Sequence, residues 1–205
     1  MLAIVPVKGV ENAKSRLAPF LSDRERAALV IAMLDDVLAA CEAASAVTET
    51  LVVTPDARVN RGDGRLIDAG TGHGEAVAFA LRDERARAGA LVVMGDCPLV
   101  TAESLDRLLA AARPVALAPA SDGGMNALAL ASPDAVDPAF GADDAARVTL
   151  ERAQAAGLEP AVVDDPALAF DVDNPPDVWK LRESGQETRA RDVLEQILPP
   201  TGGLL

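Results

Sequence analysis

The sequence is poor in the residues that build several common kinds of site. Its 205 residues include one histidine, two cysteines, one tryptophan and no tyrosine. A single imidazole, at His73, excludes a metal centre made of several histidines. Cys41 and Cys97 lie far apart in the chain, which argues against a disulfide scaffold and predicts a reducing, cytoplasmic location.

Basic residues are also scarce. The chain has 19 Lys and Arg against 32 Asp and Glu, a formal net charge of −13. Nucleic acids and anionic membrane surfaces bind clustered cations, so we expect neither as a partner. No apolar run approaches the ~20 residues that cross a bilayer. The apolar start at residues 2–7 is too short for a signal peptide core and has no basic region before it, so we expect no targeting segment.

What the chain does contain is a regular alternation of strand and helix patterns. Hydrophobic residues make up 50% of it, which predicts one domain over residues 1–198, followed by a flexible tail at 199–205. We expect buried strands at residues 2–7, 50–54, 90–94, 115–118 and 160–163, with further strands at 126–130 and 168–172. We expect helices at residues 22–44, 74–87, 101–112 and 144–156 and from Pro175 onward, and a polar loop at 58–64.

The longest of these helices has a clear start, because Ser22 and Glu25 have the spacing of a capping box. Strands separated by helices predict a three-layer α/β fold with a mostly parallel sheet. Ligands of such sheets bind beyond the carboxyl ends of the strands. The loops after Val7, Met94 and Ala118 are therefore the first places to look for chemistry.

The loop after the first strand carries an unusual density of positive charge for this acidic chain. Lys8, Lys14 and Arg16 lie within nine residues and could neutralise a polyphosphate. The loop lacks the glycine run of a Walker A motif. The alternative is a solvated basic loop with no ligand.

Carboxylates follow two other expected strands. Asp96 comes directly after the buried run at 90–94, and Asp171 and Asp173 share one face if their segment is extended. Adjacent carboxylates repel unless a cation lies between them, and Mg²⁺ prefers hard oxygen ligands. The alternatives are helix capping by Asp96 or Asp173.

Two further segments are less specific. Gly123 and Gly124 let backbone approach a ligand, which Asn126 could then hold by hydrogen bonds, although an ordinary hairpin turn has the same pattern. His73 lies in a glycine-rich loop, where a lone histidine is more often incidental than catalytic. No Ser/His/Asp or Cys/His relay can be assembled from the sequence.

Taken together, these segments resemble the 2-phospho-L-lactate/phosphoenolpyruvate guanylyltransferases, which serve the biosynthesis of the deazaflavin coenzyme F-420. The most specific piece is Ala-Lys-Ser-Arg-Leu at residues 13–17, and Gly-Asp-Cys-Pro at 95–98 and Phe-Asp-Val-Asp-Asn-Pro at 170–175 follow in order. The resemblance extends from Val5 to about Leu181 and also includes residues 6–8, 25–26, 33–38, 123–128 and 140–141. It implies a Rossmann-like nucleotidyltransferase fold of the GT-A type.

The resemblance also implies an activity and a set of site residues. GMP would pass from GTP to a small phosphorylated carboxylic acid, with release of pyrophosphate. No general base is needed, since a phosphate dianion is already a nucleophile. Mg²⁺ would be held by Asp96, Asp171 and Asp173, and the catalytic residues would be Lys14, Arg16 and Asp96. The nucleotide would bind Pro6, Val7, Lys8, Lys14, Gly72, His73, Glu75, Gly95 and Asp96, and the acid would bind Met125, Asn126, Gly141 and Asp144.

The chain departs from the family pattern at several of these places. Met125 replaces the usual threonine, Asp144 a serine and Val148 a histidine, and Gly72-His73-Gly74 stands where the family has Gly-Leu-Asn. The acid could therefore be 2-phospho-L-lactate, phosphoenolpyruvate, 3-phosphoglycerate or another acceptor. The alternative functions are a cytidylyl- or molybdenum-cofactor-type nucleotidyltransferase, a sugar-nucleotide glycosyltransferase, or a nucleotide-binding relative without catalysis. An apolar helix face would also support a homodimer.

Overall fold

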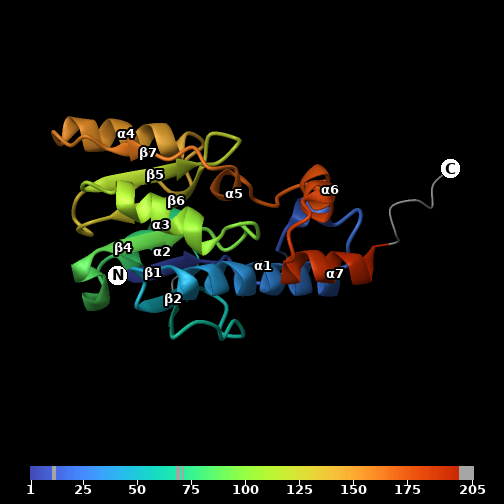
Figure 1. The fold of residues 1–205 in the computed structure, drawn as a ribbon. Helices are drawn as coiled ribbons and strands as arrows, with labels where there is room; N and C mark the ends of the chain where they lie inside the picture. Colours follow the sequence, from blue (N-terminus) through green and yellow to red (C-terminus); the bar gives the residue numbers. More distant parts are fainter. Residues whose placement is uncertain (11–12, 68–69, 71, 199–205) are drawn as a thin grey trace.

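A computed structural model describes residues 1–10, 13–67, 70 and 72–198 (Figure 1). The flexible tail expected at 199–205 lies outside the described residues. Within them, the chain forms a seven-stranded sheet of order β3-β2-β1-β4-β6-β5-β7. The strands are β1 (Leu2–Pro6), β2 (Glu49–Thr54), β3 (Gly64–Ile67), β4 (Ala90–Val93), β5 (Val115–Pro119), β6 (Met125–Leu130) and β7 (Ala161–Val162).

The sheet is mostly parallel, as the sequence predicts. β1 pairs in parallel with β2 and β4, and the pairs β2–β3 and β5–β7 are also parallel. Only β6 runs against its neighbours β4 and β5. The central strands are continuous apolar runs because both of their faces are covered.

Helices cover both faces of the sheet and complete three layers. One face packs against α1 (Asp23–Ala43) and α3 (Ala102–Ala111). α7 (Arg189–Ile197) packs against α1, and α6 (Pro175–Glu183) packs against α7 (Figure 1). The other face packs against α2 (His73–Ala80), α4 (Ala145–Ala155) and the 3-10 helix η2 (Glu84–Ala88). Side chains alternate along β1, with Ala3 and Val5 in the first core and Leu2 and Ile4 in the second.

Local capping signals set several helix starts. The Ser22 hydroxyl accepts from the Glu25 amide, and the Glu25 carboxylate accepts from the Ser22 amide, so the predicted capping box is present. Thr101 caps α3 in the same manner through Ser104. Pro175 occupies the first turn of α6, as expected.

Four sequence-based assignments need correction. The polar loop expected at 58–64 leads into an edge strand, β3, whose residues are only partly buried. The helix expected at 74–87 ends at Ala80, and Asp83 then caps η2 through the Arg85 amide. The strand expected at 168–172 is wrong, since Asp165 and Pro166 start the short helix α5 (Pro166–Ala169). Helix α7 was not expected. Among the described residues, no helix is both long and apolar enough to cross a membrane.

Candidate functional site

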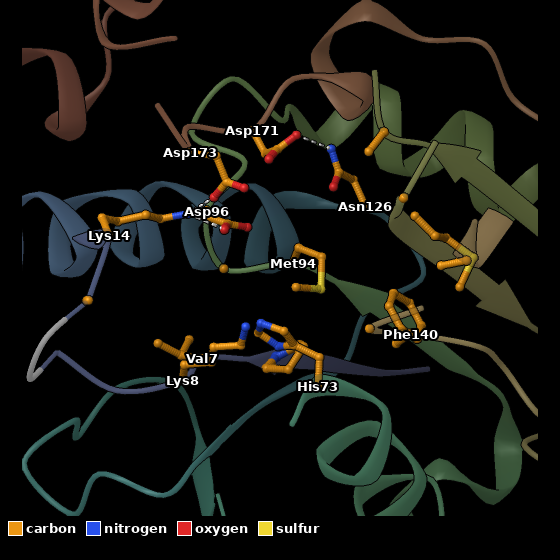
Figure 2. Close-up of a pocket in the computed structure, with 18 of the residues that line it drawn as sticks. Val7, Lys8, Lys14, His73, Met94, Asp96, Asn126, Phe140, Asp171 and Asp173 are labelled. Atoms are coloured by element: carbon orange, nitrogen blue, oxygen red, sulfur yellow. Dashed lines mark hydrogen bonds and ion pairs between the residues drawn. The ribbon is translucent and has the colours of Figure 1, made fainter. Parts of the chain in front are cut away.

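A cavity of about 770 Å³ opens at the carboxyl ends of β1 and β4 (Figure 2). Figure 2 shows the three aspartates Asp96, Asp171 and Asp173 on one wall and Lys8 and His73 on the opposite wall. Its lining combines residues from the first loop, the β4 loop, the β5–β6 turn, the segment before α4 and the segment before α6. This is the edge where ligands of open α/β sheets bind.

Lys14 is the best-held cation of this cavity. Its ammonium donates to Asp96 Oδ2 at 2.5 Å and to Asp173 Oδ1 at 2.8 Å. Burial alone would lower the pKa of this amine, but the two carboxylates raise it above its ordinary value. Lys14 therefore keeps its positive charge at neutral pH. Arg16 lies further out, with Nη1 3.6 Å from Asp173 Oδ2.

The three aspartates converge although they come from distant parts of the chain. One oxygen from each of Asp96, Asp171 and Asp173 lies within 4.8 Å of the other two. The fully buried Val172 anchors the pair between them, and its amide donates to the Asp96 carbonyl at 3.1 Å. The segment is not a strand, but both of its carboxylates line the cavity, as the sequence predicts. Asn174, not Asp173, is the N-cap of α6.

The pKa values of Asp96 and Asp171 are shifted in opposite directions. Burial raises the pKa of Asp96, but Lys14 outweighs it, and the net pKa lies below the ordinary value. Burial and then the Asp96 charge raise the pKa of Asp171 to about 6. The side-chain amide of Asn126 opposes this shift by donating to Asp171 Oδ1 at 3.2 Å. Asp171 is thus the carboxylate that most lacks a positive partner.

Apolar side chains form the wall beyond this cluster. Met94 directly follows β4, Met125 begins β6, and Phe140 precedes α4. Met125 and Phe140 are buried, and all three line the cavity. The loop at Phe140 lies very close to the start of α2, because a Cβ added to Gly74 would stand 2.5 Å from the Phe140 carbonyl oxygen. No larger residue fits at Gly74 without a shift of that loop.

The opposite wall carries two basic groups. Lys8 is exposed and follows β1, and His73 is the first residue of α2. Burial, and then the nearby Lys8, lower the pKa of His73, so its imidazole is neutral near pH 7 and can both donate and accept. His73 faces the same space as the aspartates, although they lie across the cavity (Figure 2).

Most of the predicted site residues come together in this one cavity. The lining includes Pro6, Val7, Lys8, Lys14, Arg16, His73, Gly95, Asp96, Met125, Asn126, Gly141, Asp171 and Asp173. Three others are not among its lining residues. Gly72 is the N-cap of α2, Glu75 is exposed one turn later, and Asp144 turns to Arg147, whose Nη2 is 2.9 Å from its Oδ2. The lining also includes Met94 and Phe140 and, at the mouth, Asp122 and Asp143, which the sequence analysis did not assign to the site.

Fold and site together define the class of protein. A basic loop after the first strand and an acidic cluster at the same sheet edge suit the transfer of a phosphate-linked group. A crystal structure from Desulfovibrio desulfuricans G20, described as a nucleotide-diphospho-sugar transferase, aligns with a TM-score of 0.76 at 19% identity, covering 95% of this chain and 94% of that one. CMP:2-keto-3-deoxy-manno-octonic acid synthetase in complex with CTP aligns with a TM-score of 0.61 at 16% identity, covering 89% and 97%. The fold is that of the nucleotidyltransferases.

Sequence relatives identify the family. The model of the family "Guanylyl transferase CofC like" matches residues 1–198, and the chain belongs to this family. It is 42% identical over 191 residues to the phosphoenolpyruvate guanylyltransferase of Sphaerobacter thermophilus, covering 88% of this chain and 91% of that protein. It is 37% identical over 209 residues to the 3-phospho-D-glycerate guanylyltransferase of Phenylobacterium zucineum, covering 95% of both. It is 32% identical over 197 residues to the 2-phospho-L-lactate guanylyltransferase of Methanoculleus marisnigri, covering 94% and 86%.

Proposed function

We propose that this protein is a guanylyltransferase of coenzyme F-420 biosynthesis. It transfers GMP from GTP to a small phosphorylated carboxylic acid and releases pyrophosphate. The observation that carries the proposal is the convergence of Lys14 and three aspartates in one cavity of a chain that belongs to the guanylyl transferase family. The named relatives act on three different acids, which supports a phospho-acid acceptor without selecting one.

The donor set of the aspartate cluster fits a divalent cation. Asp96, Asp171 and Asp173 offer hard oxygen atoms within 4.8 Å of one another, and one ammonium leaves them with excess negative charge. These residues would hold Mg²⁺. When bound, the ion would supply charge neutralisation to phosphate oxygens.

The protein's own residues align the reactants and oppose the charge that develops. Lys14 and Arg16 stabilise the leaving pyrophosphate from the basic loop. Pro6, Val7 and Lys8, from the end of β1 and the loop that follows, hold the nucleotide together with Gly95 and Asp96. His73 contacts the nucleotide as a neutral donor and acceptor, and Gly72 and Glu75 approach it from the rim at the start of α2. The acceptor phosphate attacks the α-phosphorus without a protein base.

The acid binds at the β6 end of the cavity, against Met125, Asn126 and Gly141. Asp144 lies beside this end with its carboxylate paired to Arg147, and it would reach the acid only by leaving that ion pair. With Met125 in place of a hydroxyl, this end offers an apolar surface beside the Asn126 amide. Shape therefore contributes more to acid selection here than hydroxyl hydrogen bonds do. We place the protein in the cytoplasm, and a homodimer stays a prediction.

The proposal is tested by pyrophosphate release in the presence of Mg²⁺. Four nucleoside triphosphates are crossed with 2-phospho-L-lactate, phosphoenolpyruvate and 3-phospho-D-glycerate. We expect release with GTP and one of the acids. Release with CTP instead would support a cytidylyltransferase. Tight GTP binding with no release for any pair would support a nucleotide-binding relative without this activity.

A further inference from the structure

Lys14 occupies the gap between two of the three clustered carboxylates. Its Nζ lies 2.5 Å from Asp96 Oδ2 and 2.8 Å from Asp173 Oδ1, and only 11% of its side chain is exposed (Figure 2). The nearest other cation, Arg16, lies 3.6 Å from Asp173 and is 73% exposed. One ammonium thus closes the cluster from within, and one guanidinium lies at its edge.

A divalent cation needs the same gap. Mg²⁺ binds oxygen ligands at about 2.0–2.1 Å, so an ion shared by these carboxylates must lie between their oxygen atoms. The Lys14 ammonium already lies between an oxygen of Asp96 and one of Asp173. Two positive charges at this distance repel strongly in a partly buried site. The ammonium and the ion therefore exclude each other from this position.

Between Lys14 and the aspartates that it contacts, Lys14 is the residue that can move more easily. Asp96 follows a central strand, and the buried Val172 ties Asp171 and Asp173 to it through the 3.1 Å bond to the Asp96 carbonyl. Lys14 lies in a connecting loop, with φ 49° and ψ 49°, and is the only non-glycine with positive φ in the part of the chain that the structure describes. This backbone conformation is unfavourable for a residue with a side chain, and the two ion pairs hold it in place.

We propose that Lys14 and a divalent cation are alternative occupants of one carboxylate site. Without metal, the ammonium neutralises Asp96 and Asp173 and keeps the cluster closed. Entry of the ion displaces the ammonium into the cavity, where it can meet the phosphates of the nucleotide. Metal binding thereby delivers Lys14 to the substrate. The consequence for catalysis rests on the proposed function, but the exchange itself can be measured without nucleotide or acid.

The chain offers a direct readout because it has only three lysines, Lys8, Lys14 and Lys180. The full-length protein is reductively methylated with and without saturating Mg²⁺, in the absence of nucleotide, and each lysine is quantified by mass spectrometry. Lys180, 66% exposed on its side chain, is the internal reference. We expect Lys14 to be protected without metal and its methylation rate to rise by at least about fivefold with metal, since its ion pairs are then broken. Protection that persists when the site is saturated would overturn the proposal.

A matched pair of variants tests the competition from the metal side. Lys14→Met and Arg16→Met each remove one positive charge near the cluster, but only the first vacates the gap. Mn²⁺ affinity is measured by EPR without nucleotide, after circular dichroism has verified folding. We expect Lys14→Met to bind Mn²⁺ at least about tenfold more tightly than wild type and Arg16→Met to stay within about threefold. Equal gains in both variants, or no Mn²⁺ binding to Lys14→Met, would contradict the exchange.

These outcomes are separable from those of the proposed function. If no nucleotide and acid pair releases pyrophosphate, methylation and Mn²⁺ binding still report whether Lys14 and the ion exclude each other. If guanylyl transfer is found but Lys14 stays protected with metal bound, the exchange is wrong and the activity stands.

Discussion

The negative charge of Asp171 is the one in the aspartate cluster that nearby positive groups balance least. Replacing Asp171 with asparagine should therefore stabilise the metal-free protein. Its pKa of about 6 stands against an ordinary value of 3.8, chiefly because of burial and the Asp96 charge. A gap of that size corresponds to at most about 3 kcal/mol of unfavourable ionisation in the folded state. Since the side chain is partly exposed, solvent screening reduces the expected gain to about 1–2 kcal/mol.

The sign follows from the proton balance of the two states. Between pH 3.8 and about 6 the folded protein keeps the Asp171 proton while the unfolded chain has lost it. Stability contributed by this group therefore falls as pH rises through that window, and the full penalty remains at higher pH. Asparagine cannot ionise, so the gain of Asp171→Asn should be full near neutral pH and should fade as pH falls toward 3.8.

Thermal unfolding in EDTA, followed by circular dichroism from a pH of about 4 to about 7.5, measures this gain. For a chain of this length we expect Asp171→Asn to raise Tm by about 2–8 °C at the upper end of this pH range. The matched control is Asp122→Asn, which removes an exposed carboxylate from the same cavity and keeps an oxygen to accept from the Gly124 amide. The control should change Tm little. A loss of stability in Asp171→Asn, or a gain that does not depend on pH, would refute the reasoning.

Four other substitutions should alter activity, metal affinity or stability. Asp96→Asn and Asp173→Asn should each lower pyrophosphate release by at least about 100-fold, because each removes a charge from the aspartate cluster; intact turnover in both would show that the cation site is placed wrongly. Asn126→Ala removes the amide that holds the cluster and should weaken Mn²⁺ binding by about 10–100-fold in an EPR titration; an unchanged affinity would assign the amide to substrate contact alone. Gly74→Ala brings a Cβ to 2.5 Å from the Phe140 carbonyl oxygen and should destabilise the fold by about 1–3 kcal/mol in urea unfolding, a cost that a wild-type midpoint would disprove.

The parts of the fold that the sequence predicts well are those with a local physical cause. The buried strands β1 and β4 are uninterrupted apolar runs, a pattern typical of strands covered on both faces. Helix α1 begins where Ser22 and Glu25 cap each other, a contact made within one turn. Alternation of such elements is enough to give the three layers.

The missed elements depend on contacts with distant residues. Helix α7 has its first amides held by Asp36 of α1, with Arg189 N at 2.8 Å from Oδ1 and Ala190 N at 2.9 Å from Oδ2. The sequence does carry one local signal, because Thr188 caps the helix through the Arg191 amide, but the contact with Asp36 spans about 150 residues and cannot be read locally. Strand β3 is an edge strand of four residues that begins with Gly64 and Arg65, so its start cannot be distinguished by sequence from the polar loop before it.

The candidate site also has features that the sequence predicts and features that it does not. The family resemblance implied that Asp96, Asp171 and Asp173 meet, whereas the residue pattern by itself suggested only that Asp171 and Asp173 share one face. That Asp144 turns out toward Arg147 could not, since a residue at a helix N-terminus is free to face either way. The insertion of Lys14 into the cluster was equally hidden, because it depends on a left-handed backbone at a residue other than glycine.

The two unusual features of the cluster, an under-compensated Asp171 and a buried Lys14, have one electrostatic cause. Three carboxylates within 4.8 Å need more positive charge than one ammonium and one exposed guanidinium can supply. The fold nevertheless keeps all three, and holds Lys14 in a strained conformation to neutralise two of them. Such an arrangement costs stability when the site is empty, and the cation that we propose for it would relieve that cost. A carboxylate that costs stability in the empty site has no structural use of its own, which supports our proposal that the cluster binds a cation.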